Sequence, residues 1–158
     1  MSDKALRDHL VAMLTETNAH VSFEDAVALF SPDLRGTRGA SFPHTGWQLL
    51  EHLRICQWDI LEFSRNPKHR SPDFPDGYWL ESASPPTDDA WDKSVADFRH
   101  DLAEMVALVR DESVDVYAKI PHGDGQTVLR EALVLAKHNS YHVGQLVMLG
   151  KALGSLDG

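Results

Sequence analysis

One stretch near the C-terminus constrains the fold more than any other, because residues 127–153 form a pattern typical of a single long helix. Apolar residues recur in it at steps of three and four, the spacing of a helical face that is directed at a core. These positions are Val128, Ala132, Leu135, Leu146, Leu149 and Leu153. A helix of this length needs partners along its whole apolar face, so the pattern favours a helical bundle.

Two histidines interrupt this apolar face. His138 and His142 are four residues apart, which places their Cβ atoms about 5–6 Å apart on one side of a helix. That spacing suits one shared metal ion. The chain has nine histidines, so a pair at this spacing is weak evidence alone, and buried histidines that only hydrogen-bond to neighbours are the alternative. A catalytic metal site would need a third ligand from another helix.

The composition limits the class of protein. The chain has 158 residues, enough for one domain, which we expect to span residues 1–158. The net charge of −9 makes a nucleic-acid partner unexpected. No apolar run approaches the length of a membrane span, so we expect no membrane partner and a cytoplasmic location. The single cysteine, Cys56, excludes an internal disulfide and agrees with a reducing compartment.

The N-terminal third predicts two helices of unequal length. Residues 3–18 carry an amphipathic pattern typical of a first helix. Ser22 with Asp25 resembles a capping box, and it predicts a short helix that ends before Pro32.

Thr45 and Gln48 form a T-x-x-Q capping box that opens a second long helix, and Asn66-Pro67 ends it near residue 65. His52 lies in this helix among apolar neighbours and is the candidate third ligand. The alternative is a core histidine that hydrogen-bonds to a neighbouring helix.

Residues 67–86 contain five of the eight prolines together with three aromatic residues, which favours an ordered loop over a flexible linker. Twenty extended residues can span about 65 Å, about twice the length of a 20-residue helix. The loop can therefore cross the whole bundle and start the next helix parallel to the last.

A third long helix follows, for which Thr87 or Asp88 is the predicted cap. Its core seam keeps alternating steps of four and three: Trp91, Val95, Phe98, Leu102, Met105 and Val109. Asp97, Asp101 and Glu104 lie off this seam and predict a solvated face. Four main helices, a short one and no strand pattern predict an all-α four-helix bundle.

Two segments in this order resemble the DinB-like (DinB/YfiT-type) metalloenzyme superfamily: PHTGWQLLEHLRICQWDILEF and IPHGDGQTVLREALVLAKHNSYHVGQLVMLGKALG. The resemblance implies an up-down-down-up bundle with a long crossover between the second and third main helices, and a homodimer. It also implies that His52, His138 and His142 bind a divalent metal at one end of the bundle. For a site of imidazole ligands we expect zinc or nickel as the bound metal, with iron or manganese as alternatives.

Characterised relatives in that superfamily include transferases and isomerases that use low-molecular-weight thiols, and hydrolases. The resemblance therefore implies a small-molecule substrate and a metal that activates either a thiol or a water. A bundle that binds metal without catalysis is an alternative. DNA repair is suggested by the family name alone, and the net charge argues against it.

Cys56 follows His52 by one helical turn and offers a further alternative. Its thiolate would complete a closed site of three histidines and one cysteine, which is typical of structural zinc. A buried lone cysteine that acts as a small apolar residue is the reading we favour.

Five further polar residues lie on, or shortly before, the predicted helices that carry the three histidines. Glu131 and Asp59 are each seven residues from a histidine, about 10 Å along a helix, and are interpreted as outer contacts or surface charges. Gln145 could orient a ligand or contact substrate. His44 and His122 each follow a proline near a helix start and could approach the rim of a pocket.

Overall fold

The computed structural model describes residues 3–154, and in that range it is helical. One isolated β-bridge joins Lys119 and Thr127, and the described residues include no strand. The α-helices are α1 (Lys4–Thr15), α2 (Phe23–Val27), α3 (Gly46–Arg65), α4 (Ala90–Arg110) and α5 (Val128–Gly154). Two 3₁₀ turns, Pro32–Leu34 and Asp76–Tyr78, lie in the connections. The predicted all-α class is confirmed.

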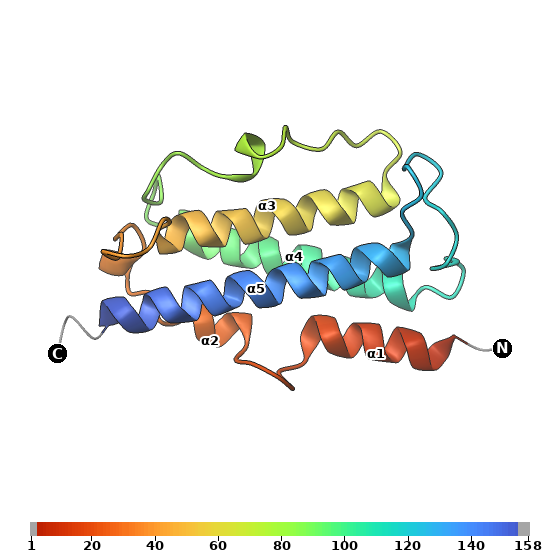
Figure 1. Ribbon diagram of the computed structural model, residues 1–158, viewed down its shortest axis with the longest axis horizontal. Coiled ribbons are helices and arrows are strands. Elements are labelled where there is room, and N and C mark those ends of the chain that lie inside the picture. The colour runs from red at the N-terminus through yellow and green to blue at the C-terminus, as the bar shows by residue number, and fades with distance from the viewer. Residues whose placement is uncertain (1–2, 155–158) are drawn as a thin grey trace.

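The long helices are arranged up, down, down, up. In Figure 1, α1 and α5 run in one direction and α3 and α4 in the other, and the yellow-green crossover returns along the length of α3 before α4 begins. The long connection between α3 and α4 thus makes these two neighbours parallel. Among the described helices, none combines the length and apolar composition that a membrane span requires.

A local capping signal marks the start of α3 but not the start of α4. The Thr45 side chain accepts from the backbone NH of Gln48, and the Gln48 side chain accepts from the NH of Thr45, which completes the predicted capping box of α3. The predicted cap of α4 is wrong. This helix begins at Ala90, and the Thr87 hydroxyl instead donates to the carboxylate of Asp89 at 2.6 Å.

Two apolar clusters fill the interior, one after the other along the bundle. The first includes Trp47, Leu50, Leu53, Trp91, Phe98, Val143 and Leu149. The second includes Leu10, Leu61, Met105, Val109 and Leu135. Between them, α3 and α5 contribute a polar layer, in which Asn139 donates to Gln57 at 3.0 Å and Gln57 donates to the carbonyl of Phe98 at 2.6 Å.

The crossover is held against α3 by side-chain hydrogen bonds. Gln48 donates to the carbonyl of Leu80 at 3.0 Å. One helical turn beyond Cys56 lies Asp59, whose carboxylate accepts from the Tyr78 hydroxyl and from His69 Nε2, both at 2.7 Å. The long loop is therefore tied to the helix that carries His52, as an ordered segment rather than a free linker.

Candidate metal centre

The structure brings together the three histidines that the sequence singles out. Nε2 of His52 on α3 lies 3.1 Å from Nε2 of His142 and 3.1 Å from Nε2 of His138, both on α5. One ligand atom from each ring lies within 4.8 Å of the other two. Such a group could hold a metal ion. It lies about midway along α5 and in the N-terminal half of α3.

Two of the three rings are oriented by oxygen acceptors on their outer nitrogen. His52 Nδ1 donates to the backbone carbonyl of Tyr78 at 2.8 Å. His142 Nδ1 faces Oε1 of Gln145 at 2.6 Å and donates to it. A proton on Nδ1 leaves a lone pair on Nε2 of a neutral imidazole. Both inward nitrogens are therefore electron-pair donors, which is the state that a metal requires.

The donor set fits a divalent cation. Two Nε2 lone pairs that face each other at 3.1 Å repel, and a cation between them turns this repulsion into two ligand bonds. Nitrogens bound at 2.0–2.1 Å to a tetrahedral zinc lie about 3.3 Å apart, close to the observed separations. The arrangement fits a metal better than it fits a set of core histidines that hydrogen-bond to one another.

Burial keeps the imidazoles neutral. His52 and His142 are each 7% exposed, and His138 is partly buried. Loss of hydration disfavours the charged form, so burial lowers the pKa of His52 and of His138 to about 4, and it also lowers the pKa of His142. All three rings are therefore unprotonated near neutral pH, and protons compete little with a cation.

Aromatic stacking from the crossover covers His52. The indole of Trp79 stacks on the His52 ring at 3.8 Å and on the His44 ring at 3.9 Å. Because two rings cannot occupy the same face at these distances, Trp79 lies between them. The sequence reasoning missed Trp79 and Tyr78 as partners of His52. Their only signal was the high aromatic content of the proline-rich loop.

A sequence model described as the DinB superfamily matches residues 5–146. The chain belongs to the DinB superfamily. The match covers most of the chain and includes all three histidines. No curated protein and no solved structure matches the chain significantly.

Cys56 does not join the converging nitrogens of this DinB-superfamily protein. Its Sγ lies 3.6 Å from Nδ1 and 3.7 Å from Nε2 of the same His52 ring, so it contacts the ring without pointing at the common centre. Burial, with a smaller contribution from the charge of Asp59, raises the pKa of the thiol to about 12. These features favour an apolar packing role over a fourth ligand.

Other candidate residues have separate partners. Asp59 reaches His52 only through Tyr78, whose hydroxyl it binds and whose carbonyl accepts from the ring. Glu131 is buried and pairs with Arg130, so its interpretation as a surface charge is wrong. His122 donates to the carbonyl of Phe63, near the far end of α3, and is not part of the cluster.

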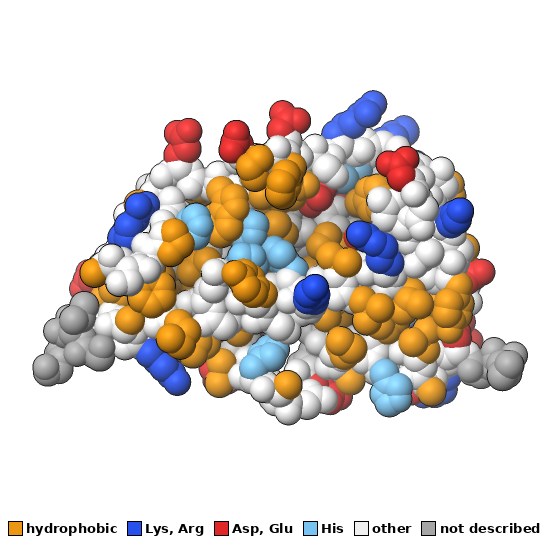
Figure 2. Space-filling view, viewed as in Figure 1, with side chains coloured by type: hydrophobic (Ala, Val, Ile, Leu, Met, Phe, Trp, Pro, Cys, Tyr) orange, Lys and Arg blue, Asp and Glu red, His pale blue; other side chains and the backbone are white. Residues whose placement is uncertain are grey.

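A pocket of about 440 Å³ opens beside the histidine cluster, between the segment before α3 and the middle of α5. Its lining includes Gln145, which holds His142, and His44, which stacks on Trp79. Figure 2 shows histidine side chains gathered on this face of the DinB-superfamily fold and bordered by hydrophobic side chains. The cluster is therefore next to a space that a small molecule can enter.

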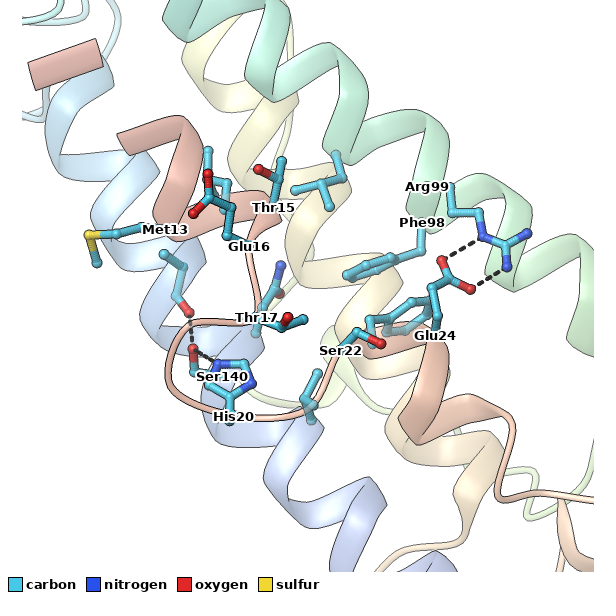
Figure 3. Close-up of a pocket in the computed structure, with 16 residues that line it drawn as sticks. Met13, Thr15, Glu16, Thr17, His20, Ser22, Glu24, Phe98, Arg99 and Ser140 are labelled. Atoms are coloured by element: carbon cyan, nitrogen blue, oxygen red, sulfur yellow. Dashed lines mark hydrogen bonds and ion pairs between the residues drawn. The ribbon is translucent and has the colours of Figure 1, made fainter. Parts of the chain in front are cut away.

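A second cavity, of about 180 Å³, lies beneath the connection between α1 and α2. Figure 3 shows polar contacts around it, among them the Glu24–Arg99 ion pair and the contact of His20 with Ser140, which is 2.9 Å long. Within residues 3–154 the three-histidine cluster is the only group identified as able to hold a metal. Its lining residues include none of the three clustered histidines, so the second cavity is separate from the candidate metal centre.

Proposed function

We propose that this protein binds a divalent metal, zinc or nickel in the first instance, through His52, His138 and His142. We propose further that it is an enzyme in which the metal activates a low-molecular-weight thiol for attack on an electrophilic small molecule. The observation that carries the proposal is the convergence of the three Nε2 atoms while oxygen acceptors hold Nδ1 of His52 and His142.

Different residues of the chain would have different roles at this centre. When bound, the metal would supply a Lewis acid that favours the deprotonated form of a thiol or a water near neutral pH. The three imidazoles are neutral, so they would leave its full charge available. Tyr78 and Gln145 fix the orientation of two ligands, and Trp79 shields His52 from water.

Among the described residues, no carboxylate joins the three clustered nitrogens as a ligand atom, which favours a thiol over a water as the nucleophile. Hydrolysis commonly uses a general base within hydrogen-bond reach of the attacking water. Among residues 3–154, no Asp or Glu belongs to the cluster, and the Asp59 carboxylate is engaged by Tyr78 and His69. A metal-dependent hydrolase with the same ligands is the second candidate, and a metal-binding protein without catalysis is the third.

The first experiment is elemental analysis of untagged protein, purified as wild type, His52→Ala and His100→Ala. His100 is exposed and lies outside the cluster. His100→Ala therefore tests whether removing a histidine that is not a proposed ligand also lowers the metal content. We expect close to one metal per chain in wild type and in His100→Ala, and none in His52→Ala. A wild type that takes up no zinc, nickel or manganese, or a His52→Ala protein with full metal content, would contradict the proposal.

The second experiment separates the candidate activities. Metal-loaded and chelator-treated protein would be assayed with thiols plus a chromogenic electrophile, and in parallel with a chromogenic ester. Metal-dependent thiol transfer without ester hydrolysis supports the proposal. Ester hydrolysis alone supports the hydrolase, and neither activity across a broad panel supports the non-catalytic alternative.

A further inference from the structure

The walls of the pocket beside the cluster contact one of the proposed metal ligands, His142. Gln145 lines the pocket and binds Nδ1 of His142. Tyr141 also lines it, and its ring meets the His142 ring edge-on at 4.9 Å. A molecule in the pocket would therefore lie against the residues that surround His142.

The lining of the pocket suits an uncharged ligand. Phe42, Leu49 and Met148 contribute apolar walls, and among the described residues that line it there is no Asp, Glu, Lys or Arg. A charged group placed there would lose hydration without an ionic partner, which is costly. Tyr141 is 65% exposed and Met148 63% exposed, so the mouth offers apolar surface that a ligand would cover.

A glycine borders this space. Gly144 lines the pocket, and a Cβ added there would meet no atom within 4 Å. Glycine inside a helix is less stabilising than alanine, and no positive φ requires a glycine at residue 144. Gly144 therefore borders open space, into which a larger side chain at this position would project.

We infer that this pocket binds the uncharged, apolar body of the substrate, a ring or short hydrocarbon group, beside the metal centre. The inference deepens the proposed function and rests on it, because it assigns the pocket to the molecule on which that centre acts. At about 440 Å³ the pocket is within the range of small-molecule sites and has room for one or two fused rings.

The test is an NMR titration of metal-loaded, ¹⁵N-labelled protein with indole and with tryptamine, its cationic relative. Gly144→Leu places a side chain in the open space. Gly154→Leu is the matched control, because Gly154 is also helical, an added Cβ there meets nothing within 4 Å, and it does not line the pocket. Met148→Lys is a second variant, and it changes an exposed residue at the mouth.

We expect indole to shift the amides around residues 141–148. Its affinity should fall at least about tenfold in Gly144→Leu and stay unchanged in Gly154→Leu. Tryptamine should bind wild type at least about tenfold more weakly, although the net charge of −9 would attract it. Met148→Lys should weaken tryptamine binding further.

Three results would overturn the inference: no indole binding, equal indole binding by Gly144→Leu, or tryptamine binding as tight as indole. Equal binding by Gly144→Leu would place indole elsewhere, as in the cavity of Figure 3. Metal content measured on the same samples distinguishes failure of the proposed function from failure of this inference. A chain that holds no metal contradicts the proposed function, whereas a metal-loaded chain that does not bind indole contradicts this inference alone.

Discussion

The contact between Gln145 and His142 offers a sensitive test of the proposed centre. His142 Nδ1 donates to Gln145 Oε1 at 2.6 Å, and this bond keeps the lone pair on the inward Nε2. Gln145→Leu removes the acceptor with little change in volume. The buried Nδ1–H then lacks a partner, at a cost of about 1–3 kcal/mol, which the ring can avoid by moving its proton to Nε2, where it blocks ligation.

The expected loss of metal affinity is about 10–100-fold, the usual effect of removing such a partner, or about 1.4–2.7 kcal/mol. Gln145→Glu keeps an acceptor in place and adds negative charge near the cation, so it should bind metal at least as tightly as wild type. Competition against a chromophoric chelator measures the affinity, and thermal melts verify the fold. Wild-type affinity in Gln145→Leu, or equal weakening by Glu and Leu, would refute the reasoning.

Three further predictions concern the thiol, pH and stability. Cys56→Ser should leave metal content unchanged, and loss of metal would revive a site with four protein ligands. Histidines titrate near 6.5 when unfolded, but folded His52 and His138 have a pKa of about 4, so protons favour the unfolded state. The metal-free protein should therefore lose about 1.6 kcal/mol of unfolding free energy per histidine between pH 6.5 and 5. Urea titrations at several pH values measure this loss. The same pH dependence in a variant with both histidines replaced by glutamine would contradict it. Buried Arg7 donates to three carbonyls around the C-terminus of α4 at 2.7–3.0 Å, so Arg7→Ala should cost about 3 kcal/mol or more in urea unfolding, whereas exposed Lys93→Ala should cost little. An equal effect of the two substitutions would rule out this role for Arg7.

The sequence predicted those parts of the fold that depend on local or periodic information. Apolar residues at steps of three and four predicted the long helices, and the capping box of Thr45 and Gln48 located the start of α3. The start of α4 was misplaced because polar residues follow one another before it and each could serve as a cap. There, the choice depends on the path of the incoming crossover.

The candidate site was likewise predictable from the sequence only in part. His138 and His142 are neighbours because they lie one helical turn apart. Gln145 contacts His142 because it lies about one further turn along the same helix. His52 could be selected from sequence only with the help of a resemblance. Its distance from the other two rings depends on how α3 packs against α5.

What the sequence by itself determined is therefore the helices, their apolar faces, and the residues able to bind a metal. Only the tertiary structure decided that the three Nε2 atoms converge, that Tyr78 and Trp79 orient and cover His52, and that a pocket without charged walls lies alongside. The physical reason is that helical order comes from contacts three or four residues apart. The site instead depends on contacts between distant segments and on the path of a loop that carries no periodic signal.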